Sequence, residues 1–117
     1  LKNMKNITII GTGYVGLVTG TGLSELGNNV ICVDKDNKKI EKLNHGELPI
    51  YEPGLEELFK KNHAKEKLSF TTEIQNSIQK SEIVIIAVGT PEKEDGSTNL
   101  EFLNSVIKVI SNNLNNV

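Results

Sequence analysis

The sequence predicts an α/β fold, in which helices cover both faces of a parallel β-sheet. Short runs of apolar, β-branched residues alternate along the chain with stretches whose apolar residues recur at helical spacing. Two of the runs are apolar almost throughout, as expected of strands that are buried on both faces. A glycine-rich turn follows the first run directly and opens the next helical stretch.

Four strands are predicted, and their composition suggests an order in the sheet. They span residues 6–10, 30–33, 68–71 and 83–88. The first and the fourth are nearly continuous in apolar residues, which favours central positions. The third is short and alternates between apolar and polar residues, which suits a place nearer the edge. Right-handed crossover connections then favour the strand order 3-2-1-4.

Five helices are predicted from the residues that start and stop them. They span residues 14–26, 36–44, 53–62, 73–79 and 100–114. Pro53 suits the first position of the third helix. Gly20 and Gly22 lie inside the first helix, where each costs about 1 kcal/mol relative to alanine. We expect close packing of this helix on the strands to compensate.

Length and charge restrict the classes of protein to consider. A chain of 117 residues has room for one domain with a core of its own. The net charge of −2 and the pI of 5.7 argue against binding to nucleic acid or to an anionic membrane, so a small molecule is the expected partner. One cysteine cannot form an internal disulfide, and no apolar run approaches the roughly 20 residues that cross a bilayer. We therefore expect a cytoplasmic protein.

The candidate binding motif is Gly11-Thr12-Gly13-Tyr14-Val15-Gly16, which joins the first strand to the first helix. In such a motif Gly11 permits the tight turn, Gly13 lets a pyrophosphate approach the backbone, and Gly16 lets the helix pack near the sheet. Free N–H groups of the first helical turn and the helix dipole predict an anion site around Tyr14 and Val15. In this strand–turn–helix context, the motif predicts a Rossmann-like, doubly wound sheet that binds a dinucleotide.

Asp34 ends the second predicted strand, about 20 residues after the glycines. A carboxylate there can accept hydrogen bonds from the ribose hydroxyls of adenosine, and it repels a 2′-phosphate. The sequence therefore predicts NAD rather than NADP, although Lys35 beside Asp34 would help to tolerate a phosphate. The alternative interpretation is that Asp34 caps the following helix.

The cysteine and the two histidines are predicted to have no catalytic or metal-binding role. Cys32 lies inside an apolar strand, where a cysteine behaves as a small buried hydrophobe. His45 and His63 lie in hydrophilic stretches, far apart and without acidic or thiol partners at ligand spacing. Both are expected to be solvated surface groups, and no metal is assigned.

Four segments of the chain resemble the UDP-glucose/GDP-mannose dehydrogenase family. Residues 11–17 are similar to its dinucleotide fingerprint, and residues 30–34, followed by Lys39-Ile40, to its second strand and ribose-binding helix. Residues 48–55 resemble the family's loop after that helix, and Ala87-Val88-Gly89-Thr90-Pro91 resembles the turn after its fourth strand. The tyrosine that precedes Glu52 is more similar to the branch that oxidises UDP-glucose than to the GDP-mannose branch.

The resemblance implies an NAD-dependent enzyme that oxidises a sugar alcohol to a carboxylate in two hydride transfers, through a thioester on a cysteine. It implies that Lys39 contacts the adenosine ribose, that Tyr51 lines the cofactor site, and that Tyr14 is a candidate for the substrate side. It also implies a supporting catalytic role for Thr90, near the nicotinamide with Gly89 and Pro91. From the residues alone, Lys39 equally fits a solvated helix face, and residues 89–91 an ordinary strand-ending turn.

The resemblance further implies that residues 1–117 form an incomplete N-terminal NAD-binding domain, with the linking helix, the substrate domain and the catalytic cysteine and lysine absent. We therefore expect the chain alone to be inactive, and the longer protein to be a homodimer that takes a UDP-sugar. GDP-mannose and UDP-N-acetylmannosamine are alternative substrates. An NAD-binding regulatory module and an S-adenosylmethionine-dependent methyltransferase are alternative classes. The regulatory module has no need for residues 51–54 and 89–91. The methyltransferase requires no third glycine at this spacing and has no pyrophosphate to bind at the helix N-terminus.

Overall fold

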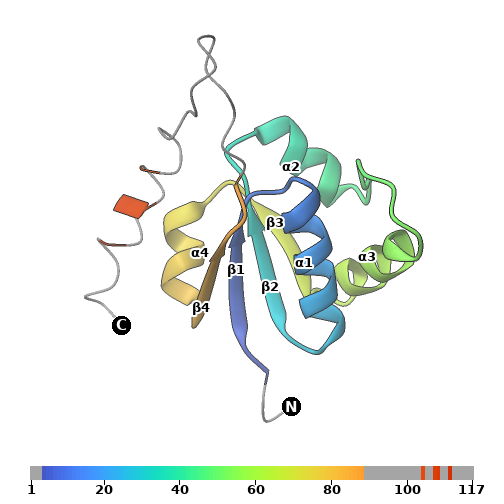
Figure 1. The fold of residues 1–117 in the computed structure, drawn as a ribbon, viewed down its shortest axis with the longest axis horizontal. Coiled ribbons are helices and arrows are strands. Elements are labelled where there is room, and N and C mark those ends of the chain that lie inside the picture. Colours follow the sequence, from blue (N-terminus) through green and yellow to red (C-terminus); the bar gives the residue numbers. More distant parts are fainter. Residues whose placement is uncertain (1–3, 89–103, 105–106, 109–110, 112–117) are drawn as a thin grey trace.

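The predicted α/β fold and the predicted strand order are confirmed by the computed structural model, which describes residues 4–88 and Asn104, Ile107, Lys108 and Ser111. Four parallel strands form one sheet in the order β3-β2-β1-β4 (Figure 1). The elements follow one another as β1 (Asn6–Ile10), α1 (Tyr14–Glu25), β2 (Asn29–Val33), α2 (Asn37–Asn44), α3 (Leu55–Ala64), β3 (Leu68–Thr71), α4 (Ile74–Lys80) and β4 (Ile83–Ile86).

The register of the sheet brings the carboxyl ends of all four described strands to one edge. Ile10, the last residue of β1, pairs with Val33 of β2 and with Ile86 of β4. Val33 in turn pairs with Thr71 at the end of β3. Ligands of open α/β sheets bind beyond this edge, because the loops that follow the strands converge there.

Alternating residues of the strands build a core on each face of the sheet. Ile7 and Ile9 of β1 pack in the larger core, together with residues of α1, α2 and α3. Ile10 packs instead against Ile78 of α4, so this helix covers the opposite face (Figure 1). On that face the buried Thr8 hydroxyl donates to the carbonyl of Ser77 over 3.0 Å, which ties α4 to the central strand. Helices therefore pack on both faces of the sheet, and β1 and β2 both end at the edge where ligands of such sheets bind.

Several predicted element boundaries need correction. The third helix begins at Leu55 rather than at Pro53, because Gly54 precedes it as the cap in a left-handed conformation (φ 82°). The fourth strand ends at Ile86 rather than at residue 88, since β1, its described partner, turns away after Ile10. The predicted helix 100–114 lies outside the described residues, except for the four isolated positions, which are helical.

Strand β4 is not central in the part of the chain that the structure describes, although its composition predicted that position. There it pairs only with β1, and Ile83 and Ile86 are 41% and 40% exposed. An apolar strand sequence favours burial, but it does not reveal which neighbouring elements cover the side chains or whether both backbone edges are hydrogen-bonded.

The two glycines inside α1 differ, so the predicted close packing is confirmed for only one of them. A Cβ added at Gly20 would stand 2.8 Å from Sγ of Cys32 and 3.3 Å from Cδ1 of Ile9, so this glycine lets α1 lie close to β1 and β2. A Cβ at Gly22 would meet nothing within 4 Å.

The predicted burial of Cys32 is confirmed, whereas the predicted solvation of His63 is wrong. Cys32 is fully buried, and burial raises the pKa of its thiol to about 12, so it is not a nucleophile at neutral pH. His63 is half-buried, and its ring centroid lies 6.0 Å from that of Phe59 and 5.8 Å from that of Phe70. Helix α3 places the imidazole beside these rings, stacked on Phe59 and tilted to Phe70, a contact that the surrounding polar sequence does not reveal. His45 is exposed, as predicted.

Candidate functional site

The first glycine of the fingerprint holds the turn between the ends of three strands. Gly11 follows β1 with φ 116°, a conformation that other residues rarely adopt. Its N–H donates to the carbonyl of Val33 over 2.7 Å, and an added Cβ would stand 2.7 Å from the carbonyl oxygen of Ala87. Only glycine therefore allows the chain to turn out of β1 between β2 and β4.

The second glycine faces open space at the start of α1. Gly13 is the N-terminal cap, without a side-chain hydrogen bond to the helix, and an added Cβ would meet nothing within 4 Å. The first backbone bond of the helix runs from the N–H of Leu17 to the carbonyl of Gly13, so the N–H groups of Tyr14, Val15 and Gly16 precede it. Open space in front of these donors, with the positive end of the helix dipole, makes a seat for an anion such as a pyrophosphate.

The third glycine packs against the turn itself. A Cβ at Gly16 would overlap the carbonyl oxygen of Gly11 and stand 2.9 Å from its carbonyl carbon. The sheet is a more distant neighbour, since the nearest sheet-side atom is Cβ of Ala87 at 3.7 Å. The predicted need for glycine is thus present, but the atoms that require it belong mainly to the turn.

Asp34 is held rigidly beyond the end of β2. Its Oδ2 accepts hydrogen bonds from the hydroxyl of Thr12 (2.6 Å) and from the N–H of Thr12 (3.2 Å), and Nζ of Lys39 lies 3.7 Å away. Its Oδ1 accepts from the N–H of Asp36 over 3.1 Å. Burial opposes ionisation, but these hydrogen bonds and the charge of Lys39 outweigh it and lower the pKa of Asp34 below its ordinary value. The carboxylate is therefore charged at neutral pH.

The helix-capping interpretation of Asp34 is wrong. Asp36 caps α2, since its carboxylate accepts from the N–H groups of Lys38 and Lys39. Asp34 instead lies beyond the carboxyl ends of β1 and β2, where its carboxylate bonds to Thr12. Lys39 is likewise more than a solvated helix residue, because it forms the ion pair with Asp34.

Thr12 is a site residue that sequence reasoning missed. Its side chain is 1% exposed and its hydroxyl bonds to Asp34, which lies 22 positions later in the chain. The only signal in the sequence is a hydroxyl residue between the first two glycines of the motif, and that signal has no partner until the strands are paired.

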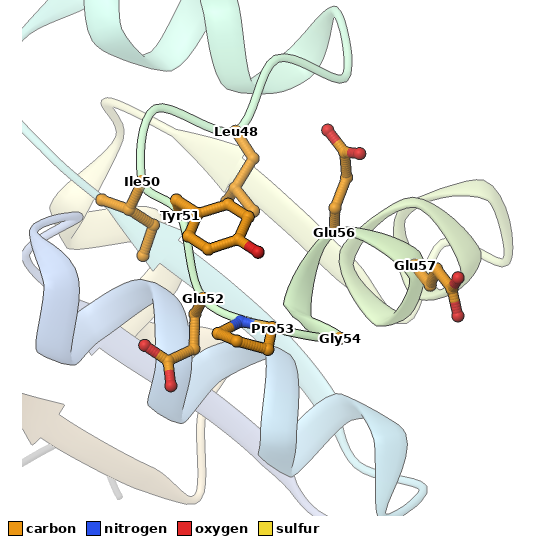
Figure 2. A pocket seen from close by; sticks show the side chains of 8 residues that line it. All are labelled: Leu48, Ile50, Tyr51, Glu52, Pro53, Gly54, Glu56 and Glu57. Carbon is orange, nitrogen blue, oxygen red and sulfur yellow. The ribbon is translucent and has the colours of Figure 1, made fainter.

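The loop before α3 contacts the first turn of α1. The hydroxyl of Tyr14 donates to Oε2 of Glu52 over 2.5 Å. This hydrogen bond, with desolvation and the charge of the same carboxylate, raises the pKa of Tyr14. Glu52 also lines a hollow of about 230 Å³, and Figure 2 shows its carboxylate directed away from those of Glu56 and Glu57. Tyr51, at the same hollow, is 87% exposed.

Some predicted residues cannot be placed. Gly89, Thr90 and Pro91 lie outside the described residues. Just before them, the N–H of Ala87 donates to the carbonyl of Ile10 over 2.8 Å, so the chain leaves β4 beside the end of β1.

Over the described ranges, no group of three or more His, Cys, Asp or Glu side chains could hold a metal ion. No helix among those residues is long and apolar enough to cross a bilayer.

Comparisons with known proteins agree with this geometry. Residues 5–117 match the model of the NAD-binding domain of the UDP-glucose/GDP-mannose dehydrogenase family. The UDP-glucose 6-dehydrogenase YwqF of Bacillus subtilis (strain 168) is 52% identical over 106 residues, which are 91% of this chain and 24% of that protein. A second enzyme of the same name and organism, TuaD, is 48% identical over 112 residues, 96% of this chain and 24% of that protein.

Solved structures of nucleotide-sugar dehydrogenases contain a domain with the same fold. The structure of a ternary complex of GDP-mannose dehydrogenase from Pseudomonas aeruginosa superimposes with a TM-score of 0.83 at 40% identity, covering 90% of this chain and 24% of that one. A UDP-glucose dehydrogenase from Pyrobaculum islandicum has a TM-score of 0.83 at 33% identity, covering 92% and 25%. The chain thus spans about a quarter of the length of YwqF and of TuaD.

Proposed function

Because this chain belongs to the UDP-glucose/GDP-mannose dehydrogenase family, and matches the NAD-binding domain of that family, we propose that it binds the adenosine and pyrophosphate of NAD in a protein that oxidises UDP-glucose. The observation that carries the proposal is that the open first turn of α1 and the anchored carboxylate of Asp34 lie at the same edge of the sheet. When bound, NAD supplies the acceptor for the hydride of the sugar alcohol.

The pyrophosphate is assigned to the first turn of α1. Gly13 leaves the space that a side chain would fill, and the N–H groups of Tyr14 and Val15 belong to the four that a helix leaves without an internal partner. No acidic side chain lies in this turn of the helix to repel the phosphates. These features support an anionic ligand at this position.

The adenosine ribose is assigned to Asp34 and Lys39. A charged carboxylate is a strong acceptor for the two ribose hydroxyls, and it repels the additional phosphate of NADP. Lys39, ion-paired with that carboxylate, lies close enough to contribute a donor to the same sugar.

UDP-glucose is proposed as the substrate from the relatives. YwqF and TuaD, which are 52% and 48% identical to the chain, are both UDP-glucose 6-dehydrogenases. The roles of Tyr51 at the cofactor, of Tyr14 at the substrate and of Gly89, Thr90 and Pro91 at the nicotinamide remain part of the proposal. So do the homodimer, the cytoplasmic location and the inactivity of residues 1–117 without a substrate domain.

The substrate proposal is tested by measuring NADH formation in the natural protein that carries this chain. We expect kcat/KM for UDP-glucose to exceed the values for GDP-mannose and UDP-N-acetylmannosamine by at least about 100-fold, since a site built around polar groups discriminates strongly. Residues 1–117 alone serve as the control and should produce no NADH. A preference for GDP-mannose would refute the assignment of the sugar nucleotide.

The ribose assignment predicts that Asp34→Ala weakens NAD binding about 10- to 100-fold, the loss of hydrogen bonds to a charged group. Isothermal titration calorimetry of NAD measures the effect. The matched control is Asp36→Ala, which removes the same charge two residues later and the cap of α2. It should lower stability by about 1 kcal/mol and leave NAD affinity nearly unchanged. Equal NAD affinities for Asp34→Ala and the unsubstituted protein would show that the ribose lies elsewhere.

A further inference from the structure

Thr12 directs both its side-chain hydroxyl and its backbone N–H to one atom. The residue is 1% exposed, and both its hydroxyl (2.6 Å) and its N–H (3.2 Å) donate to Oδ2 of Asp34. A buried hydroxyl needs a partner, but most find a backbone carbonyl nearby, as Ser24 does with Thr21. Thr12 instead bridges from the glycine turn after β1 to the residue that follows β2.

The two oxygens of Asp34 are therefore unequal. Oδ2 has two hydrogen bonds from Thr12 and the ammonium of Lys39 beside it, which uses the acceptor capacity of one carboxylate oxygen. Oδ1 accepts one bond among the described residues, from the N–H of Asp36. One lone pair of Oδ1 thus stays available to a ligand, on a carboxylate whose rotation is restricted from both sides.

We propose that Thr12 is a positioning residue for Asp34, which presents Oδ1 to the adenosine ribose and thereby sets the preference for NAD over NADP. The inference rests on the proposed NAD site and adds to it a residue that acts through Asp34. A carboxylate held in one orientation offers its free lone pair to the ribose hydroxyls and keeps its charge where a 2′-phosphate would lie. Without the Thr12 hydroxyl, the carboxylate loses the shortest of its hydrogen bonds and is held less firmly in this orientation, so both the attraction and the repulsion weaken.

Valine and serine at position 12 separate the hydroxyl from the packing. Thr12→Val keeps the shape of the side chain and removes its hydroxyl, whereas Thr12→Ser keeps the hydroxyl and removes a methyl group. In the natural protein that carries this chain, we expect Thr12→Val to weaken NAD binding about 10-fold, the effect of one hydrogen bond to a charged group. NADP affinity should stay equal or rise, so the NAD/NADP ratio falls about 10-fold or more. Thr12→Ser should keep the ratio of NAD affinity to NADP affinity close to that of the unsubstituted protein.

A double-mutant cycle with Asp34→Ala shows whether Thr12 acts through Asp34. Calorimetric titration with NAD and NADP is carried out on the unsubstituted protein, both single variants and the double variant. If Thr12 acts through Asp34, Thr12→Val changes neither affinity once residue 34 is alanine. The proposal is overturned if Thr12→Val costs the same with and without the Asp34 carboxylate, or if the NAD/NADP ratio is unchanged by Thr12→Val.

The same titrations distinguish failure of this inference from failure of the proposed function. NAD binding by the unsubstituted protein that Asp34→Ala weakens, together with an inert Thr12→Val, contradicts only the role of Thr12. An unsubstituted protein that binds no NAD contradicts the proposed function, and the role of Thr12 falls with it.

Discussion

We expect Gly13→Val to abolish NAD binding while the protein stays folded. A Cβ at this position meets no atom within 4 Å, and the backbone (φ −79°, ψ −166°) is extended, a conformation that valine accepts. The added side chain instead fills the space in front of the first turn of α1, so the pyrophosphate is kept away from the helical N–H groups. Calorimetry should show a loss of at least about 100-fold, the size expected when several charge-assisted hydrogen bonds are lost.

Gly13→Ala and a thermal unfolding curve complete this experiment. Alanine adds only a methyl group, so its loss of NAD affinity should be smaller than that of valine. The melting temperatures of both variants should lie close to that of the unsubstituted protein. Undiminished NAD binding by folded Gly13→Val would exclude the fingerprint as the pyrophosphate site.

Gly16→Ala is expected to destabilise the fold strongly, by about 3 kcal/mol, the upper range for overpacking a site that cannot relax. Its Cβ would overlap the carbonyl oxygen of Gly11, which belongs to the backbone of a turn already held between β2 and β4. The matched control is Gly22→Ala in the same helix, where the Cβ meets nothing within 4 Å. This variant should gain up to about 1 kcal/mol through helix propensity.

Urea denaturation followed by circular dichroism measures both free energies of unfolding. The structure predicts changes of opposite sign for one and the same substitution, six residues apart in α1. Equal effects at the two positions would contradict the close approach of α1 to the glycine turn, because helix propensity alone treats both glycines alike.

The sequence by itself determined the four strands, their order in the sheet and the position of the glycine motif and Asp34 at the ends of β1 and β2. This was possible because the responsible signals are local. The apolar runs of β1 and β2, the spacing of Gly11, Gly13 and Gly16, and an aspartate directly after a strand each lie within a few residues. Right-handed crossovers then leave few topologies for such a chain.

Tertiary structure alone decided which side chains meet at the site and how tightly each position is packed. Thr12 reaches Asp34 across 22 positions, and Tyr14 reaches Glu52 across 38, so neither contact exists until the strands pair and the loop before α3 returns to α1. The different surroundings of Gly20 and Gly22, and the half-buried ring of His63, have the same origin. The type of a residue sets which hydrogen bonds it is able to donate or accept and how much space its side chain occupies. Its partners are set by the register of the sheet and the packing of helices on it, which depend on the whole chain at once.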